Sequence, residues 1–225
     1  MFNYITSLLL ISSIVFIILV SFDLEFSDIS NLSFAQNSNF TNNNTNINSS
    51  SNINNSTKNE TGATDVATTD WLTFSNDKFV LKYPHDWNVE KKLSKFHVLD
   101  FKLIKNNPFS FIGISFSSLT NPEEFTNKII LDEAEKFGMD ASSSGFEVYE
   151  VLDKDLNKHT IDGNPSSFHI VKYKYEDNGL EGKIMEIFSL IDKSLFTLTY
   201  QSTVENFDKD LPVVEKIIDS IKIIK

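Results

Sequence analysis

The side chains best suited to holding a metal ion lie between positions 153 and 169. Asp153 and Asp155 open the stretch DKDLN, which matches the first half of an EF-hand calcium loop. That loop needs glycine at its sixth position and glutamate at its twelfth, where this chain has Lys158 and Asn164. The sequence therefore predicts a solvated acidic turn, with a weak calcium site built from these oxygens as the alternative.

Two histidines that flank a predicted turn offer a second metal hypothesis. His159 and His169 lie on either side of Asp162-Gly163, so they could meet across a sheet and form a transition-metal site with Asp162. No two histidines are spaced four residues apart, and no H-E-x-x-H motif is present. We expect ordinary histidines, either exposed or hydrogen-bonded, and we predict no cofactor.

Catalytic motifs find no support in the sequence. No G-x-S-x-G turn or glycine-rich phosphate loop occurs, and the run SSSG at 142–145 has no strand-to-helix context. The acidic pair Glu123-Glu124 fits helix capping and solvation. The sequence predicts a protein that is not an enzyme. A secreted hydrolase whose site is assembled from scattered residues is the remaining catalytic alternative.

Charge and cysteine content exclude several classes of partner and chemistry. The 225-residue chain carries 31 acidic and 20 basic residues, all of the latter lysine, for a net charge of -11. This balance disfavours electrostatic binding to nucleic acid or anionic lipid, and the absence of arginine removes bidentate guanidinium contacts. Without cysteine the chain has no disulfide, thiolate metal site or cysteine nucleophile.

Residues 1–35 are predicted to be a signal peptide or an N-terminal membrane anchor. Residues 5–22 form an apolar run without a formal charge. Ser33 and Ala35 precede Gln36 with the small side chains that a signal peptidase requires, so we expect cleavage after Ala35. Retention as a membrane anchor is the alternative. Either way the protein is expected outside the cytoplasm, membrane-associated or secreted.

Residues 36–70 are predicted to be a disordered tether. The segment is almost entirely Asn, Ser and Thr, and it cannot bury enough apolar surface to offset the entropy of ordering it. In an exported chain its N-x-S/T sequons are candidates for glycosylation; they start at Asn39, Asn43, Asn48, Asn54, Asn55 and Asn59. A tract of this composition also produces sequons by chance, so a glycan-coated stalk and a bare linker both stay open.

Residues 71–225 have the pattern of an α+β domain. Alternating, β-rich segments predict an antiparallel sheet of six to eight strands flanked by helices. A short turn at 192–194 predicts that the last two strands pair as a hairpin. The expected strands are 71–74, 79–83, 96–104, 109–117, 146–152, 166–175, 183–191 and 195–202.

Two helices are expected to cover this sheet. Asn121 suits a helix N-cap and Pro122 the first helical position, so a helix is predicted from there to a stop at Gly138. A second helix is expected to begin near Asp210, because apolar residues recur at helical spacing from Val214 onward.

The order of these elements and several short motifs resemble the PsbP-like superfamily. Among its members the chain is most similar to small exported proteins of ammonia-oxidising archaea, which often carry a signal end like Phe34-Ala35-Gln36. The motifs that carry the resemblance are Tyr83-Pro84-x-x-Trp87, Ile161-Asp162-Gly163-Asn164-Pro165 before a long strand, and the closing LPVVEKIIDSI at 211–221.

That resemblance implies an extracytoplasmic αβα sandwich that docks on a larger complex and does not catalyse a reaction. No metal-binding residue of the family can be matched here, and the motif residues are assigned structural roles. We therefore expect an accessory or docking protein of an envelope or membrane-associated complex. Binding of a small ligand or a metal ion is the alternative function.

Overall fold

The computed structural model describes residues 70–90, 101–106, 109–140, 146–176 and 179–224. The predicted signal segment with its cleavage site at Ala35 and Gln36, the tether and the sequons lie outside these ranges. Within the described ranges, no helix is long and apolar enough to cross a membrane.

An eight-stranded antiparallel sheet forms the centre of the domain, which confirms the predicted α+β class. Its order is β3-β4-β5-β10-β9-β8-β6, with β7 paired to β8. A second sheet of order β1-β2-β11 was not predicted. The strands are β1 Leu72–Ser75, β2 Phe79–Tyr83, β3 Asn88–Val89, β4 Phe101–Asn106, β5 Phe109–Ser118, β6 Phe146–Asp155, β7 Thr160–Ile161, β8 Asn164–Tyr175, β9 Glu181–Ile191, β10 Ser194–Ser202 and β11 Lys222–Ile223.

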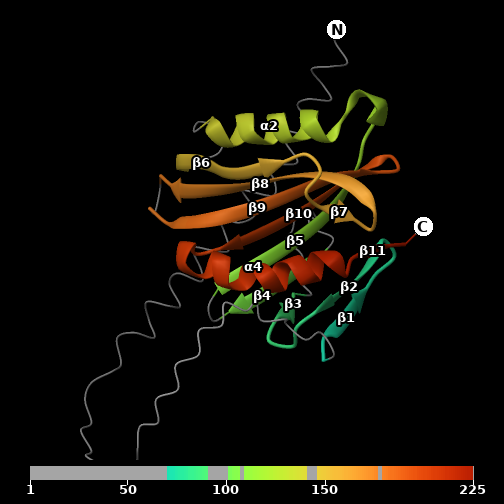
Figure 1. Cartoon of the computed structure of the whole chain (residues 1–225), viewed down its shortest axis with the longest axis horizontal. Helices are drawn as coiled ribbons and strands as arrows, with labels where there is room; N and C mark the ends of the chain where they lie inside the picture. The colour runs from blue at the N-terminus through green and yellow to red at the C-terminus, as the bar shows by residue number, and fades with distance from the viewer. Residues whose placement is uncertain (1–69, 91–100, 107–108, 141–145, 177–178, 225) are drawn as a thin grey trace, which may run out of the picture.

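Strands β9 and β10 are buried on both faces because helices pack on both sides of the sheet (Figure 1). Helix α4, Val204–Asp219, and the small sheet share one apolar core with the large sheet. Helix α2, Asn127–Met139, shares a second core with β6, β8 and β9. Neighbouring residues of a strand therefore point into different layers.

Helix α2 begins later than predicted. Pro122–Glu124 form a separate 3-10 turn, η1, and Phe125 after it is extended. The helix starts at Asn127, where the Thr126 hydroxyl accepts the Ile129 N–H at 3.2 Å. Thr126 is therefore the N-cap in place of Asn121.

Helix α4 begins earlier than predicted, at Val204 instead of near Asp210. Pro212 lies inside the helix, where its missing N–H deprives one carbonyl of its helical partner. The hydroxyl of Tyr200 on β10 donates to the Phe207 carbonyl at 3.0 Å. This bond attaches the N-terminal half of α4 to the sheet.

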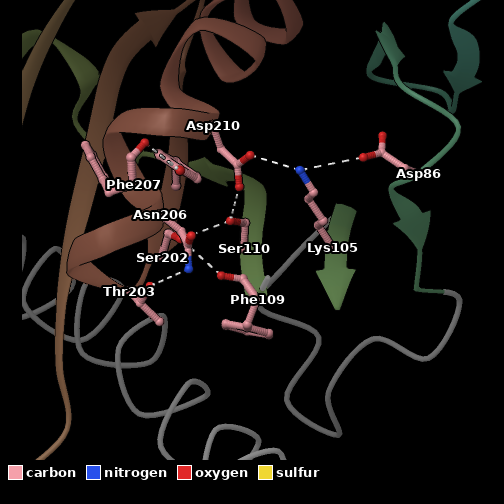
Figure 2. Close-up of polar contacts among 10 residues, drawn as sticks. Asp86, Lys105, Phe109, Ser110, Ser202, Thr203, Asn206, Phe207 and Asp210 are labelled. Carbon is pink, nitrogen blue, oxygen red and sulfur yellow. Dashed lines mark hydrogen bonds and ion pairs between the residues drawn. The ribbon is translucent and has the colours of Figure 1, made fainter. Parts of the chain in front are cut away.

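A buried carboxylate fixes α4 against the large sheet (Figure 2). Asp210 is 6% exposed, and its two oxygens accept from Lys105 Nζ at 2.9 Å and from Ser110 Oγ at 2.6 Å. Ser110 lies 3.0 Å from the Ser202 hydroxyl, which also donates to the Phe109 carbonyl at 3.0 Å. One chain of polar contacts thus joins α4 to β4, β5 and β10.

The turn between β7 and β8 holds the end of the chain. Asp162 and Gly163 have φ of 49° and 80°, as both central residues of a type I′ hairpin turn require. The Asp162 carboxylate accepts the Ile223 N–H and the Lys222 ammonium, both at 3.0 Å. Asp162 therefore attaches β11 to the β7–β8 hairpin.

Replacing Asp210 by asparagine should lower the free energy of unfolding by about 2 kcal/mol, since Lys105 then loses its nearest carboxylate. Asp208→Asn is the matched control. The Asp208 side chain is 69% exposed and pairs with Lys183 at 2.8 Å, so we expect a cost of about 0.5 kcal/mol or less. Urea denaturation measures both variants, and equal costs would contradict the anchoring role of Asp210.

Candidate functional site

The structure does not bring together the three residues of the predicted transition-metal site. The His169 ring faces the α2 layer, 5.8 Å from the Phe188 ring. The His159 ring contacts Phe168, at 4.9 Å, in the core that contains α4. Since Phe168 and His169 are neighbours on β8, the two histidines lie on opposite faces of the sheet. The Asp162 carboxylate accepts the backbone N–H of Ile223 on β11.

The predicted acidic turn begins inside a strand. Asp153 and Asp155 belong to β6, which is longer than predicted. Asp153 pairs with Lys158 Nζ at 3.1 Å, and Asp155 Oδ1 accepts the Asn157 N–H at 2.6 Å. Across the described ranges, no group of three His, Asp or Glu residues is placed to hold a metal ion. Weak binding of calcium or a transition metal stays a prediction.

A different cluster of charged side chains is buried between α2 and the sheet. His169 on β8 is 0% exposed, and its Nε2 lies 2.8 Å from Oε2 of Glu186 on β9. Its Nδ1 lies 4.0 Å from Oε1 of Glu135 on α2. Glu186 and Glu135 are 4% and 8% exposed. At the rim, the Lys154 ammonium of β6 lies 2.9 Å from Glu135 Oε2.

Three atoms of this cluster have no hydrogen-bond partner among the described residues. They are Glu135 Oε1, His169 Nδ1 and Glu186 Oε1. A buried polar atom left without a partner costs about 1–3 kcal/mol, so each one calls for an explanation. Both oxygens of Asp210, by contrast, are bonded. We therefore treat the His169 cluster as the candidate functional site and the Asp210 cluster as structural.

Tyr149 packs beside this cluster because α2 presents no side chain at Gly138. A Cβ on Gly138 would lie 2.2 Å from the Tyr149 ring. Burial, and then the charges of Glu186 and Glu135, raise the pKa of Tyr149 well above its usual value of 10. The hydroxyl therefore stays protonated at neutral pH and keeps its ability to donate a hydrogen bond.

Glu135 connects the buried cluster to the surface. It lines an open depression of about 400 Å³ along α2, together with Asp132, Lys136, Met139 and Asp140. The carboxylates that line the depression suit a cationic group. The Met139 side chain suits the apolar stem of a long side chain that carries such a group. His169 has no exposed surface, so it can influence a bound molecule only through Glu135.

Sequence reasoning missed Glu135 and Glu186, although one of them left a signal. Glu186 interrupts the apolar run from Ile184 to Phe188, and a charge at that place in a buried strand requires a partner. Glu135 left no comparable signal. It stands in α2 close to Asp132 and Glu133, acidic residues that are more exposed, so its burial could not be distinguished from the sequence.

Comparison with known proteins identifies the fold. No family model and no curated protein matches the sequence. The solution structure of cyanobacterial PsbP (CyanoP) from Synechocystis is 14% identical with a TM-score of 0.51, and the match covers 74% of this chain and 98% of that one. LpqN of Mycobacterium tuberculosis, described as involved in cell envelope biogenesis, is 14% identical with a TM-score of 0.48, covering 65% and 83%. The likeness to CyanoP shows a PsbP-like fold.

Gly138→Ala should lower the free energy of unfolding by about 1–3 kcal/mol, because the new methyl group collides with the Tyr149 ring. In a Tyr149→Ala background the same change should raise it by about 0.5–1 kcal/mol, since alanine is the better helix former. Urea denaturation of the four proteins of this double-mutant cycle measures the coupling. A destabilising Gly138→Ala change in both backgrounds would show that the ring is not the obstacle.

The stability of the domain should depend on pH through His159. Burial lowers the pKa of this ring below its usual 6.5, and the charge of Glu215 offsets only part of that effect. Just below pH 6.5 the unfolded chain therefore binds more protons, so the free energy of unfolding should fall as the pH falls through this window. His159→Gln should flatten this part of a denaturation series between about pH 7.5 and 5. An unchanged slope would exclude the histidine as its source.

Proposed function

We propose that this chain is a non-enzymatic accessory protein that acts outside the cytoplasm by docking on an envelope or membrane protein complex. The observation that carries the proposal is the surface around α2 and the edge strand β6. Met139 is exposed at the end of α2, and Val148 and Leu152 are exposed on β6, where Val148 lies on the sheet face that α2 does not cover. Exposed apolar groups within a polar rim are typical of protein interaction sites.

The sequence at the N-terminus supports the same role. An export segment over residues 1–35 would carry the domain out of the cytoplasm, and a tether over 36–70 would give it the reach to meet a complex there. The PsbP-like fold agrees with the docking function that the family resemblance implies. An origin among ammonia-oxidising archaea and the glycosylation of the tether are further parts of this proposal.

Metal or small-ligand binding and hydrolysis are the competing functions. Docking is preferred because the exposed Met139 lines an open depression beside the carboxylates of Asp132 and Asp140, which suits contact with another protein. A buried His169 offers no surface for a substrate.

Site-specific photo-crosslinking of the full chain in its native host tests the proposal. A photoreactive amino acid is placed at Met139 or Leu152. The matched exposed positions are Leu72 on the small sheet and Ile224, the residue that follows β11. We expect one discrete adduct, with a protein of the envelope, from the first pair and none from the second. Docking is contradicted if none of the four positions gives a discrete adduct.

A further inference from the structure

We propose that the outer edge of β6 binds an extended, basic segment of the docking partner, which adds to the large sheet as a further strand. This inference rests on the proposed docking function and names the element and the chemistry of the contact. In strand addition the two backbones are joined by hydrogen bonds, and the side chains along the edge select the partner.

Strand β6 lies at one end of the large sheet (Figure 1). Among the described strands β8 is its only neighbour, so within that part of the chain the other edge of β6 is unpaired. The strand is ten residues long, and seven of these residues are exposed. A long, accessible edge of this kind is a template for pairing with another chain.

The hydrogen bonding of β8 shows which backbone groups of β6 point outward. In antiparallel sheets, successive residues of a strand direct their N–H and C=O groups alternately to one neighbouring strand and to the other. The Tyr175 N–H donates at 3.0 Å to the carbonyl of Leu180, on the β9 side. Lys174 and Lys172 therefore direct their backbone groups to the opposite side, toward β6.

The register between β6 and β8 then identifies the open groups. Lys174 and Lys172 pair with Val148 and Glu150, which therefore use their backbone groups on β8. Tyr149 and Val151 alternate with these two residues, so their N–H and C=O groups point to the outer edge. Each of them offers one donor and one acceptor to an incoming strand.

The side chains of β6 fit an extended partner of positive charge. Val148 and Leu152 are exposed and provide apolar surface beside the edge. The strand also carries four carboxylates and a single ammonium group, at Glu147, Glu150, Asp153, Asp155 and Lys154. Opposite charges on paired strands stabilise a sheet, whereas like charges directly opposite each other destabilise it. We therefore expect lysine or arginine on the incoming strand.

The same charges disfavour a second copy of this chain as the occupant. Two paired β6 edges would bring carboxylates together on molecules that each carry a net charge of -11. Two register shifts, one after Phe146 and one after Val151, also bend the strand. Such bulges protect an edge from indiscriminate pairing. The edge therefore resists self-association and favours a basic segment of another protein.

Mapping of crosslinks tests the geometry. In the full chain in its native host, a photoreactive amino acid is placed at Val148 or at Glu150, which lie on one face of β6. The two adducts should map to partner residues about two positions apart, as in paired strands, within a segment rich in lysine or arginine. Leu72, an exposed position on β1, is the control and should give no adduct with that segment.

The substitution Val151→Pro tests the backbone contact. Because the Val151 N–H points to the outer edge, proline removes a donor there and leaves the hydrogen bonds between β6 and β8 in place. The photo-adduct formed from Leu152 should fall about five-fold or more, as expected for the loss of one hydrogen bond. Val151→Ala is the matched control, because it shortens the same half-buried side chain and keeps the N–H. It should leave most of the adduct.

A charge variant provides a second measurement, which decides the matter if the proline variant does not fold. Glu150→Gln should lower the Leu152 adduct about two-fold or more, because one cross-strand pair of opposite charge is lost. Glu123→Gln removes the same charge from an exposed position on η1 and should leave the adduct unchanged. A circular-dichroism melting curve establishes which variants are folded.

Several outcomes overturn the inference. The adducts from β6 contain a second copy of this chain, or they map to a segment without basic residues or without the two-residue spacing. Alternatively, the Leu152 adduct persists at full level in the folded Val151→Pro variant or in Glu150→Gln. Capture of an envelope protein from Met139 and not from β6 also overturns the inference, while docking itself survives. If no position yields an adduct, the docking function fails together with the inference.

Discussion

Strands β9 and β10 are buried on both faces, and this determines what every charged side chain near them must do. A charge held in such a layer has no route to water and needs a partner in the layer that it faces. On one face, Asp210 of α4 meets Lys105 and Ser110. On the other, Glu186 meets His169. The pairing of these buried charges therefore helps to position α2 and α4, in addition to apolar packing.

The two buried clusters differ in how completely their polar atoms are hydrogen-bonded. Every oxygen of Asp210 is bonded, so that cluster is complete and rigidly defines where α4 lies. In the α2 layer, Glu135, His169 and Glu186 each keep one atom without a partner among the described residues. Incomplete networks of this kind are costly, and an unsatisfied buried atom in a natural protein is explained by a bound water or ion, by stored strain or by a functional role. This difference is why we treat the Asp210 cluster as structural and the His169 cluster as the candidate site.

Local chemistry explains what the sequence could predict. The β9–β10 hairpin and the Asp162-Gly163 turn follow from residue types at turns, and the strands follow from alternation. The helix starts could not be placed, because Pro212 is accommodated inside α4 and Thr126 replaces Asn121 as a cap. The small sheet pairs β2 with β11 from the far end of the domain, which no local pattern reports. The candidate site was missed because its residues come from α2, β8 and β9.

The pairing of β2 with β11 has a consequence for biogenesis. The first strands of the domain find their last neighbour only after residues 222–223 have left the ribosome. Until then the edge of β2 is open, and the Asp162 carboxylate lacks the backbone N–H of Ile223 that it binds in the finished domain. Such long-range closure slows folding. A domain closed by its last strand therefore completes the small sheet only after all of its other strands have been synthesised.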